Sequence, residues 1–136
     1  MTPDGLVTIA SAHDPVETMA RVVAAVTERG LSILARIDHA GAAAKAGLAL
    51  RPTEVLIFGN PKAGTPLMQA AQSFGIDLPL KILVWQDEAG ATWLGYNDPA
   101  WLAQRHHATD GTDRILAAMT GGLAAIAAQA AARTNP

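Results

Sequence analysis

The fold is decided by the stretch PLKILVWQDEAGATWLGYN, which occupies residues 79–97. Its two ends are rich in strand-forming residues, and the segment DEAG between them is typical of a turn. We therefore expect a β-hairpin with strands at residues 79–86 and 91–96. With Glu88-Ala89-Gly90 as the loop, Trp85 lies directly opposite Trp93, and both faces of the hairpin carry large apolar side chains.

The rest of the chain alternates between strand and helix signals. Strands are predicted at residues 6–11, 31–37 and 53–59, and helices at residues 15–29, 38–47 and 65–74, with two more beginning at Pro99 and near Asp113. The continuous apolar middle of residues 53–59 is expected of a central strand covered on both faces. This order predicts an α/β (α+β) fold, a two-layer sandwich whose mixed, largely antiparallel sheet of about five strands has helices mainly on one face.

Length and composition exclude several classes of protein. The 136 residues suffice for a single domain with its core at residues 5–132, and the 50% apolar content excludes a disordered chain. Ten basic residues against 12 acidic ones give no electrostatic footprint for nucleic acid or an anionic membrane. The absence of cysteine excludes disulfides and thiolate chemistry. With neither a signal peptide nor an uninterrupted apolar span in the sequence, we expect a cytoplasmic protein.

The segment FGNPKAGTP, residues 58–66, is the strongest candidate for ligand contact. A strand is expected to end there, and a helix to begin with Thr65 as its cap. Exposed amides at the start of a helix, together with Lys62 and Asn60, favour an anion such as a carboxylate or a phosphate. The Gly-Lys-Ser/Thr order of a nucleotide-binding loop is absent. The alternative is an ordinary strand-to-helix turn that contains Gly and Pro for backbone reasons.

The pair Asp38-His39 and the residue Asn97 are two further candidates. A histidine oriented by a carboxylate can act as a general base, although Asp38 can equally cap the helix that follows it. Asn97 stands where the second hairpin strand ends, and Asp98 can cap the next helix. If the strands that end near residues 59 and 97 share one edge of the sheet, Lys62 and Asn97 converge there. His39 is then expected close enough to transfer a proton.

Metal and nucleophile chemistry have weaker signals. The four histidines lack the spacing of a metal site, so neither a metal nor another cofactor is expected. The serines, Ser73 among them, have no evident base partner and no nucleophile-elbow motif around them, which disfavours hydrolase chemistry. His106-His107 lies in a polar connection and is expected to face solvent.

The two tryptophans of the hairpin bear on assembly. On a sheet face without helices, Trp85 and Trp93 would form an apolar patch of a kind that monomers seldom expose. We interpret this face as a homodimer interface. The alternative is that the C-terminal helix covers it.

A series of motifs distributed along the chain resembles domain-of-unknown-function family 302. These motifs are RIDHA at 36–40, LRPTEVLIFGNPK at 50–62, GTPLM at 64–68, DLPLK at 77–81, WQD at 85–87, YNDP at 96–99 and LAQR at 102–105. The resemblance extends over residues 5–132. It implies a small two-layer α/β domain that is dimeric and occurs in bacteria or archaea, and it brings no activity, substrate or catalytic residue. Gly41 and Gln86 depart from the residues usual in the family.

Three hypotheses of function follow. The first is a homodimeric binding module for a small anionic ligand held near His39, Asn60, Lys62 and Asn97. The second is an enzyme with His39 as general base and Lys62 stabilising developing negative charge. The third is a structural or partner-binding protein that uses the open sheet face. Neither nucleic acid nor a membrane is expected as a partner.

Overall fold

Three helices begin with the same signal, a capping Asp or Asn followed by proline. The side-chain oxygens of Asp14, Asn60 and Asp98 accept backbone amides of the following first turn at 2.7, 3.0 and 3.1 Å. Such a cap satisfies a helix-end donor, and proline in the first turn costs no hydrogen bond because its missing N–H has no partner there. These local signals fix where α1, α3 and α4 start.

The computed structural model describes residues 2–133. The strands are β1 (Leu6–Ser11), β2 (Ser32–Asp38), β3 (Thr53–Gly59), β4 (Leu80–Gln86) and β5 (Thr92–Asn97). The helices are α1 (Pro15–Glu28), α2 (His39–Lys45), α3 (Pro61–Ala70), the 3₁₀ helix η1 (Gln72–Ile76), α4 (Pro99–Arg105) and α5 (Asp113–Ala131). The predicted α+β fold is confirmed.

The five strands form one sheet in the order β1-β5-β4-β3-β2, and every neighbouring pair is antiparallel. The prediction of a largely antiparallel sheet is therefore confirmed, and the parallel pair that a mixed sheet would contain is not found among the described strands. As predicted, β3 lies inside the sheet, between β4 and β2, although the middle strand of the five is β4. The apolar middle of β3 has a helix-covered face and an open face instead of two covered ones.

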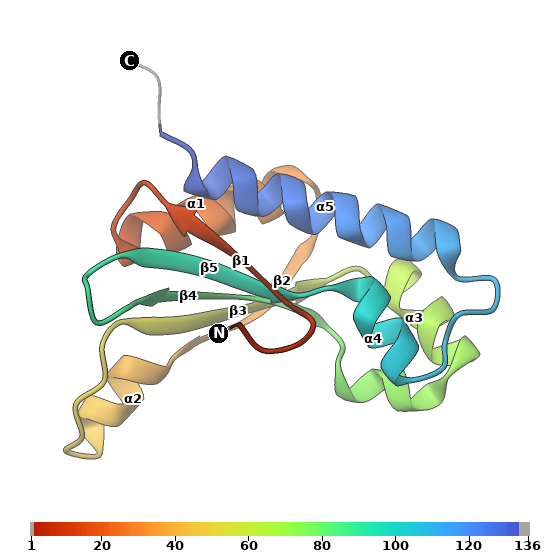
Figure 1. Ribbon diagram of the computed structural model, residues 1–136, viewed down its shortest axis with the longest axis horizontal. Helices are drawn as coiled ribbons and strands as arrows, with labels where there is room; N and C mark the ends of the chain where they lie inside the picture. The colour runs from red at the N-terminus through yellow and green to blue at the C-terminus, as the bar shows by residue number, and fades with distance from the viewer. Residues whose placement is uncertain (1, 134–136) are drawn as a thin grey trace.

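The main core lies between the sheet and two helices, α1 and α5, which cover the same face (Figure 1). Alternate residues of the three inner strands point into it, as a pleated strand requires. Its fully buried side chains include Met19, Val22, Val26, Leu56, Phe58, Ile82, Val84, Leu94, Leu123 and Ile126. The opposite face of the sheet carries no helix along its middle, and α2 projects on that side (Figure 1).

A second core cluster lies beyond one end of the sheet. There α3, η1, α4 and the first turns of α5 pack together around Leu67, Phe74, Leu102 and Leu116. Leu80 at the start of β4 packs against both clusters. The two cores therefore meet where β4 begins.

Helix α5 is long and apolar enough to span a membrane by length and hydropathy alone. Buried core helices of globular proteins meet the same criteria. In this fold one face of α5 is packed against α1 and the sheet, with Leu123, Ile126 and Ala130 almost fully buried. These contacts make α5 a core helix of the domain.

Helix α3 begins earlier than its sequence suggests. It starts at Pro61 with Asn60 as the cap, whereas Thr65 was expected to cap a helix at Pro66. Both segments are a polar residue followed by proline, so local sequence favours them equally. Thr65 and Pro66 therefore lie inside the helix, and the predicted capping role of Thr65 is wrong.

Candidate functional site

A cavity of about 790 Å³ lies at the junction of the two cores. Its walls come from α3, from one side of α5, and from the ends of β2, β3 and β4 near Gly59. The α5 residues on the wall are Arg114, Ile115, Ala118, Met119, Gly122, Leu123 and Ile126, which repeat at three- and four-residue intervals. That spacing places them on one face of the helix. The volume lies within the range of small-molecule sites in proteins.

The charged residues of this cavity are all cationic. Arg29 follows the end of α1, Lys62 lies in the first turn of α3 and Arg114 in the first turn of α5, and no acidic residue among those the structure describes joins them in the lining. Within residues 2–133 none of these three side chains has an ion pair or a side-chain hydrogen bond. Their charge is thus available to a bound anion.

Three of the residues predicted to bind a ligand lie in this lining, namely Asn60, Lys62 and Thr65. The Asn60 side chain already accepts the backbone amide of Lys62, so it acts chiefly as a helix cap. Lys62 is exposed and brings a free ammonium group to the cavity. Sequence reasoning missed Arg29 and Arg114, because they reach the cavity from helices far away along the chain.

Asp38 and His39 lie at the opposite end of the sheet. Strands β2 and β3 are antiparallel, with Ser32 opposite Gly59 and Asp38 opposite Glu54. His39 therefore follows the end of β2 that is farthest from the cavity, and the expected pocket shared by His39 and Lys62 does not exist. The Asp38 carboxylate accepts the amide of Gly41 at 2.9 Å, which is the capping alternative.

Asn97 lies at the same end of the sheet as the cavity but does not line the cavity. Strands β3 and β5 run in the same direction because β4 pairs antiparallel with both, so their ends share one edge as expected. With β4 between them, Asn97 lines a separate small hollow with Asp77 and Lys81. The convergence of Asn97 with Lys62 is thus not observed.

A hydrogen-bonded series connects η1 to the end of α4. The Ser73 hydroxyl lies 2.8 Å from Nδ1 of His106, whose Nε2 lies 2.5 Å from the Asp77 carboxylate. Arg105 donates to both oxygens of the same carboxylate. The side chain of His106 is only 7% exposed, so the expectation that it faces solvent is wrong.

Ser73 therefore has a base partner, His106, which the sequence did not predict. His106 and Ser73 are 33 residues apart in the chain, and no local motif connects them. Chemically, His106 can take the proton of the Ser73 hydroxyl while Asp77 orients the ring. None of the three residues lines the cavity, and their contacts fasten η1 to α4.

A metal site has no support in the part of the chain that the structure describes. No group of three or more His, Asp or Glu side chains in residues 2–133 is arranged to hold a metal ion. The cationic lining of the cavity would itself repel one.

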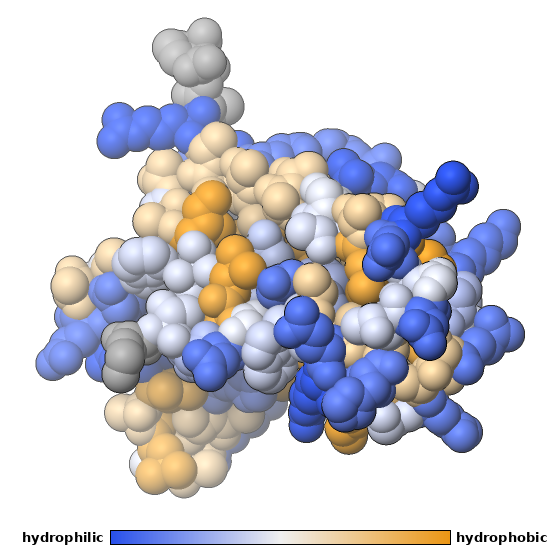
Figure 2. All heavy atoms as spheres, turned by 45° about the vertical axis from the view of Figure 1, so that its right-hand side comes forward, coloured by the Kyte–Doolittle hydropathy of each residue, from blue (hydrophilic) through white to orange (hydrophobic). Residues whose placement is uncertain are grey.

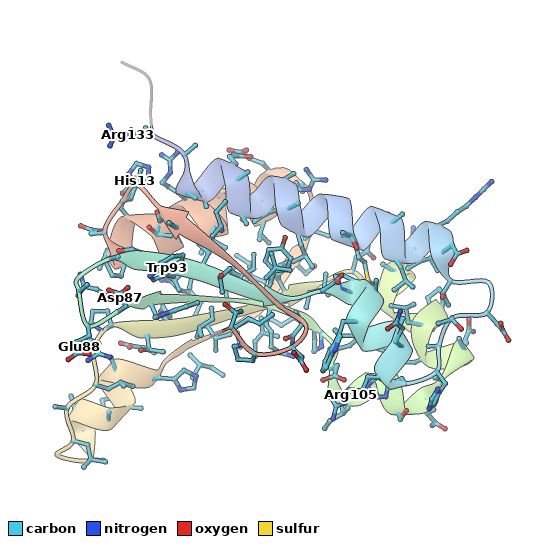
Figure 3. All side chains as sticks on the ribbon, in the orientation of Figure 1. His13, Asp87, Glu88, Trp93, Arg105 and Arg133 are labelled. Atoms are coloured by element: carbon cyan, nitrogen blue, oxygen red, sulfur yellow. The ribbon has the colours of Figure 1, made fainter. Side chains whose placement is uncertain are left out.

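The hairpin register is confirmed, with Trp85 directly opposite Trp93. Trp93 also donates its indole N–H to Oδ2 of Asp87 at 2.8 Å (Figure 3). This hydrogen bond, followed by that from the Ala91 amide, holds the pKa of Asp87 below its ordinary value. Both tryptophans lie on the sheet face without helices, half-buried by neighbouring side chains.

Comparisons with known proteins agree with this architecture. The family model described as Domain of unknown function DUF302 matches residues 7–126. The solved structure of an uncharacterised conserved DUF302 protein from Bacillus stearothermophilus superimposes with a TM-score of 0.82 over 94% of this chain and 99% of that one, at 22% identity. At that identity the likeness concerns the fold.

Two curated relatives have names that refer to a function. Proteins called fluoride-specific ion channel FluC 1, from Brucella suis biovar 1 and from Brucella abortus biovar 1, are each 46% identical over 127 residues, which is 93% of this chain. The matched region is 50% and 47% of their respective lengths. The chain therefore spans about half the length of these relatives, and the name describes the longer proteins.

Proposed function

Since this chain belongs to the DUF302 family, which has no assigned activity, we propose a function from the cavity itself: a binding module for a small anionic molecule. The single observation that carries this proposal is the lining, in which Arg29, Lys62 and Arg114 have no acidic partner within residues 2–133. The chain as a whole has a net charge of −2, so this group of cations runs against its average charge. Unpaired cations beside an apolar wall favour a ligand with complementary charge.

The enzyme alternative with His39 as base has no support from the geometry, because His39 lies at the far end of the sheet from Lys62. An anion held at the cavity would meet no histidine or carboxylate base there, since the described residues of the lining include neither. Binding without chemical conversion is the function that these residues favour.

The test uses 8-anilinonaphthalene-1-sulfonate, an anionic aromatic dye that fluoresces in apolar surroundings. The dye should bind the wild-type protein, and binding should weaken as salt screens the cations. Lys62→Ala combined with Arg114→Ala should lower the affinity at least about thirtyfold, since each change removes a charge-assisted contact. The control is Lys45→Ala, an exposed cation on α2 that is outside the cavity. Equal binding by all three proteins would overturn the proposal.

We also infer that the open sheet face is the contact between two copies of this chain. The residues on this face include Leu6, Ala35, Ile37, Val55, Ile57, Leu83, Trp85 and Trp93. Lys81 is the one charged residue that the described strands place there, at the cavity end of β4. A face with so little charge can meet its own copy about a two-fold axis without like-charge repulsion.

The area of the open sheet face is consistent with an interface between two copies of this chain. Five strands of six or seven residues give a projected area on the order of 450 Å². Helix α2 projects on the same side, and Leu48 and Leu50 after it are 66% and 50% exposed. In the space-filling view, hydrophobic side chains also gather on the part that projects at the lower left (Figure 2). Together these surfaces approach the roughly 800 Å² that each partner buries in a standard interface.

The oligomeric state tests this second proposal. Light scattering over a dilution series should give a dimer at micromolar concentration. Ile37→Glu places a charge on the open face at a side chain that is 41% exposed, so it should dissociate the dimer and leave the fold intact. Val16→Glu, at an 82% exposed side chain on α1, is the matched control. A wild-type protein that stays monomeric at high micromolar concentration would remove the claim.

A further inference from the structure

We propose that the ligand of the cavity is an amphiphile with one anionic head group and a single flexible hydrocarbon chain. This inference rests on the proposed binding function and adds the chemical class of the ligand. A compact anion such as acetate or phosphate would satisfy the cations but leave water against the apolar walls in most of the 790 Å³. The apolar remainder of the cavity therefore needs an apolar part of the same ligand.

The interior of the cavity is hydrocarbon. Half-buried apolar side chains line it from both sides: Leu31 packs against the main core, and Met68, Leu78 and Ile115 pack against the second cluster. A chain that enters between the two clusters would contact both of them. Burying each methylene of that chain against such a wall is favourable by the hydrophobic effect.

The entrance carries the charge. The guanidinium of Arg29 lies over α5 at Gly122, with Nη2 3.7 Å from the position a Cβ would take there. Lys62 and Arg114 are exposed and line the same cavity. A carboxylate or phosphate at this rim keeps partial contact with water and gains charge-assisted hydrogen bonds, most readily from the planar guanidinium groups.

The wall is also adaptable, which favours a flexible chain over a rigid polycyclic ligand. Met68 and Met119 lie in the lining, and methionine side chains adjust their shape at little cost. Leu34 on the edge strand β2 lines the cavity while 59% exposed, so a chain that leaves the entrance can cover it. These residues accommodate hydrocarbon chains of several lengths.

Calorimetry with the full protein and a series of carboxylates of increasing chain length tests the proposed class of ligand. From butyrate to decanoate, affinity should rise about three- to fourfold for each added methylene until the cavity is full. Decanol should bind at least about tenfold more weakly than decanoate, and decyltrimethylammonium more weakly still, because neither supplies an anion to the rim. If butyrate and decanoate bind equally well, or decanol matches decanoate, the amphiphile proposal is overturned.

Two variants test where the hydrocarbon chain of the ligand binds. Ala118 is exposed and lines the cavity, so Ala118→Trp should fill the space from the solvent side and abolish decanoate binding. Ala117→Trp, at the neighbouring exposed position outside the lining, is the control and should bind as the wild type does. If the two variants bind decanoate equally well, its hydrocarbon chain lies outside this cavity and the proposal is overturned.

A vesicle measurement separates a free amphiphile from a lipid in a bilayer. The protein should not sediment with phosphatidylglycerol vesicles under conditions where it binds decanoate. If the protein does sediment with the vesicles and Ala118→Trp prevents this, the ligand is a lipid of the bilayer and the proposal of a free amphiphile is overturned. The dye experiment tests the binding function, and the decanoate experiment tests the class of ligand. Dye binding that depends on Lys62 and Arg114, without decanoate binding, would overturn only the amphiphile, whereas failure of both would overturn the binding function as well.

Discussion

Trp85 and Trp93 lie directly opposite each other in the β4–β5 hairpin, on the sheet face opposite helices α1 and α5. Trp93 is also fixed at its indole N–H, which donates to the carboxylate of Asp87 at 2.8 Å (Figure 3). This contact couples the hairpin turn to the open face. Because the indole hydrogen bond favours the ionised carboxylate of Asp87, the stability of the turn depends on pH.

Trp93→Phe should raise the pKa of Asp87 toward its ordinary value, because the largest cause of its depression is the indole hydrogen bond. A depressed pKa in the folded state means that the contribution to stability is present above the unfolded pKa, about 3.9, and is lost as pH falls through the folded value. The wild type should therefore lose this stabilisation below about pH 4, and the variant should lose less. Carboxyl NMR titration of Asp87 checks the shift, and identical titrations in both proteins would contradict it.

Asp77→Ala should destabilise the fold by about 1–3 kcal/mol, since the Asp77 carboxylate accepts hydrogen bonds from both Arg105 and His106 with only 14% of its side chain exposed. Ser73→Ala should cost less, about 0.5–1.5 kcal/mol, because it removes one contact at an exposed position. Urea unfolding measures both values. A larger loss for Ser73→Ala than for Asp77→Ala would mean that the carboxylate does not hold η1 to α4.

Much of the fold could be predicted from the sequence because its signals are local. The hairpin register followed from the loop length, and the starts of α1 and α4 followed from Asp14-Pro15 and Asp98-Pro99. The start of α3 was misplaced because Asn60-Pro61 and Thr65-Pro66 are equivalent local signals. The helix starts at the first of them, and Ala63 in the added turn packs against the second core, a tertiary contact that the local sequence does not reveal.

The site could be predicted only in part, for a related reason. Lys62 was found because it stands next to a strand end and a helix start, which are visible in one segment. The position of His39 depends on the direction of β2 relative to β3, and antiparallel pairing put it at the far end. Arg29 and Arg114 join Lys62 only through the packing of α1 and α5, which no single segment encodes.

Lys62→Ala should weaken the binding of an anionic ligand by about 1–3 kcal/mol, the range for a hydrogen bond to a charged group, and the loss should shrink as salt rises. His39→Ala should leave binding unchanged, because His39 follows the end of β2 opposite the cavity. Dye titrations at two salt concentrations compare the variants. A loss on changing His39 equal to that on changing Lys62 would contradict the separation of the two residues.

Gly5→Ala should destabilise the fold more than Gly30→Ala does. Both glycines have a positive φ, +77° and +73°, where alanine costs about 1 kcal/mol or more. A Cβ at Gly5 would in addition collide with the Trp101 ring, whereas nothing lies within 4 Å of one at Gly30. Thermal unfolding of both variants isolates the contact with Trp101, and equal losses would show that the ring moves away freely.

The methionine methyl groups provide the most direct measurement of the central claim, that an anion binds in the cavity between α3 and α5. Met68 and Met119 line this cavity, and Met19 is buried in the main core away from its lining. In a ¹³C-methyl NMR titration with 8-anilinonaphthalene-1-sulfonate, the signals of Met68 and Met119 should shift with a common affinity while that of Met19 stays in place. Saturation of the dye fluorescence with Met68 and Met119 unmoved would contradict the account.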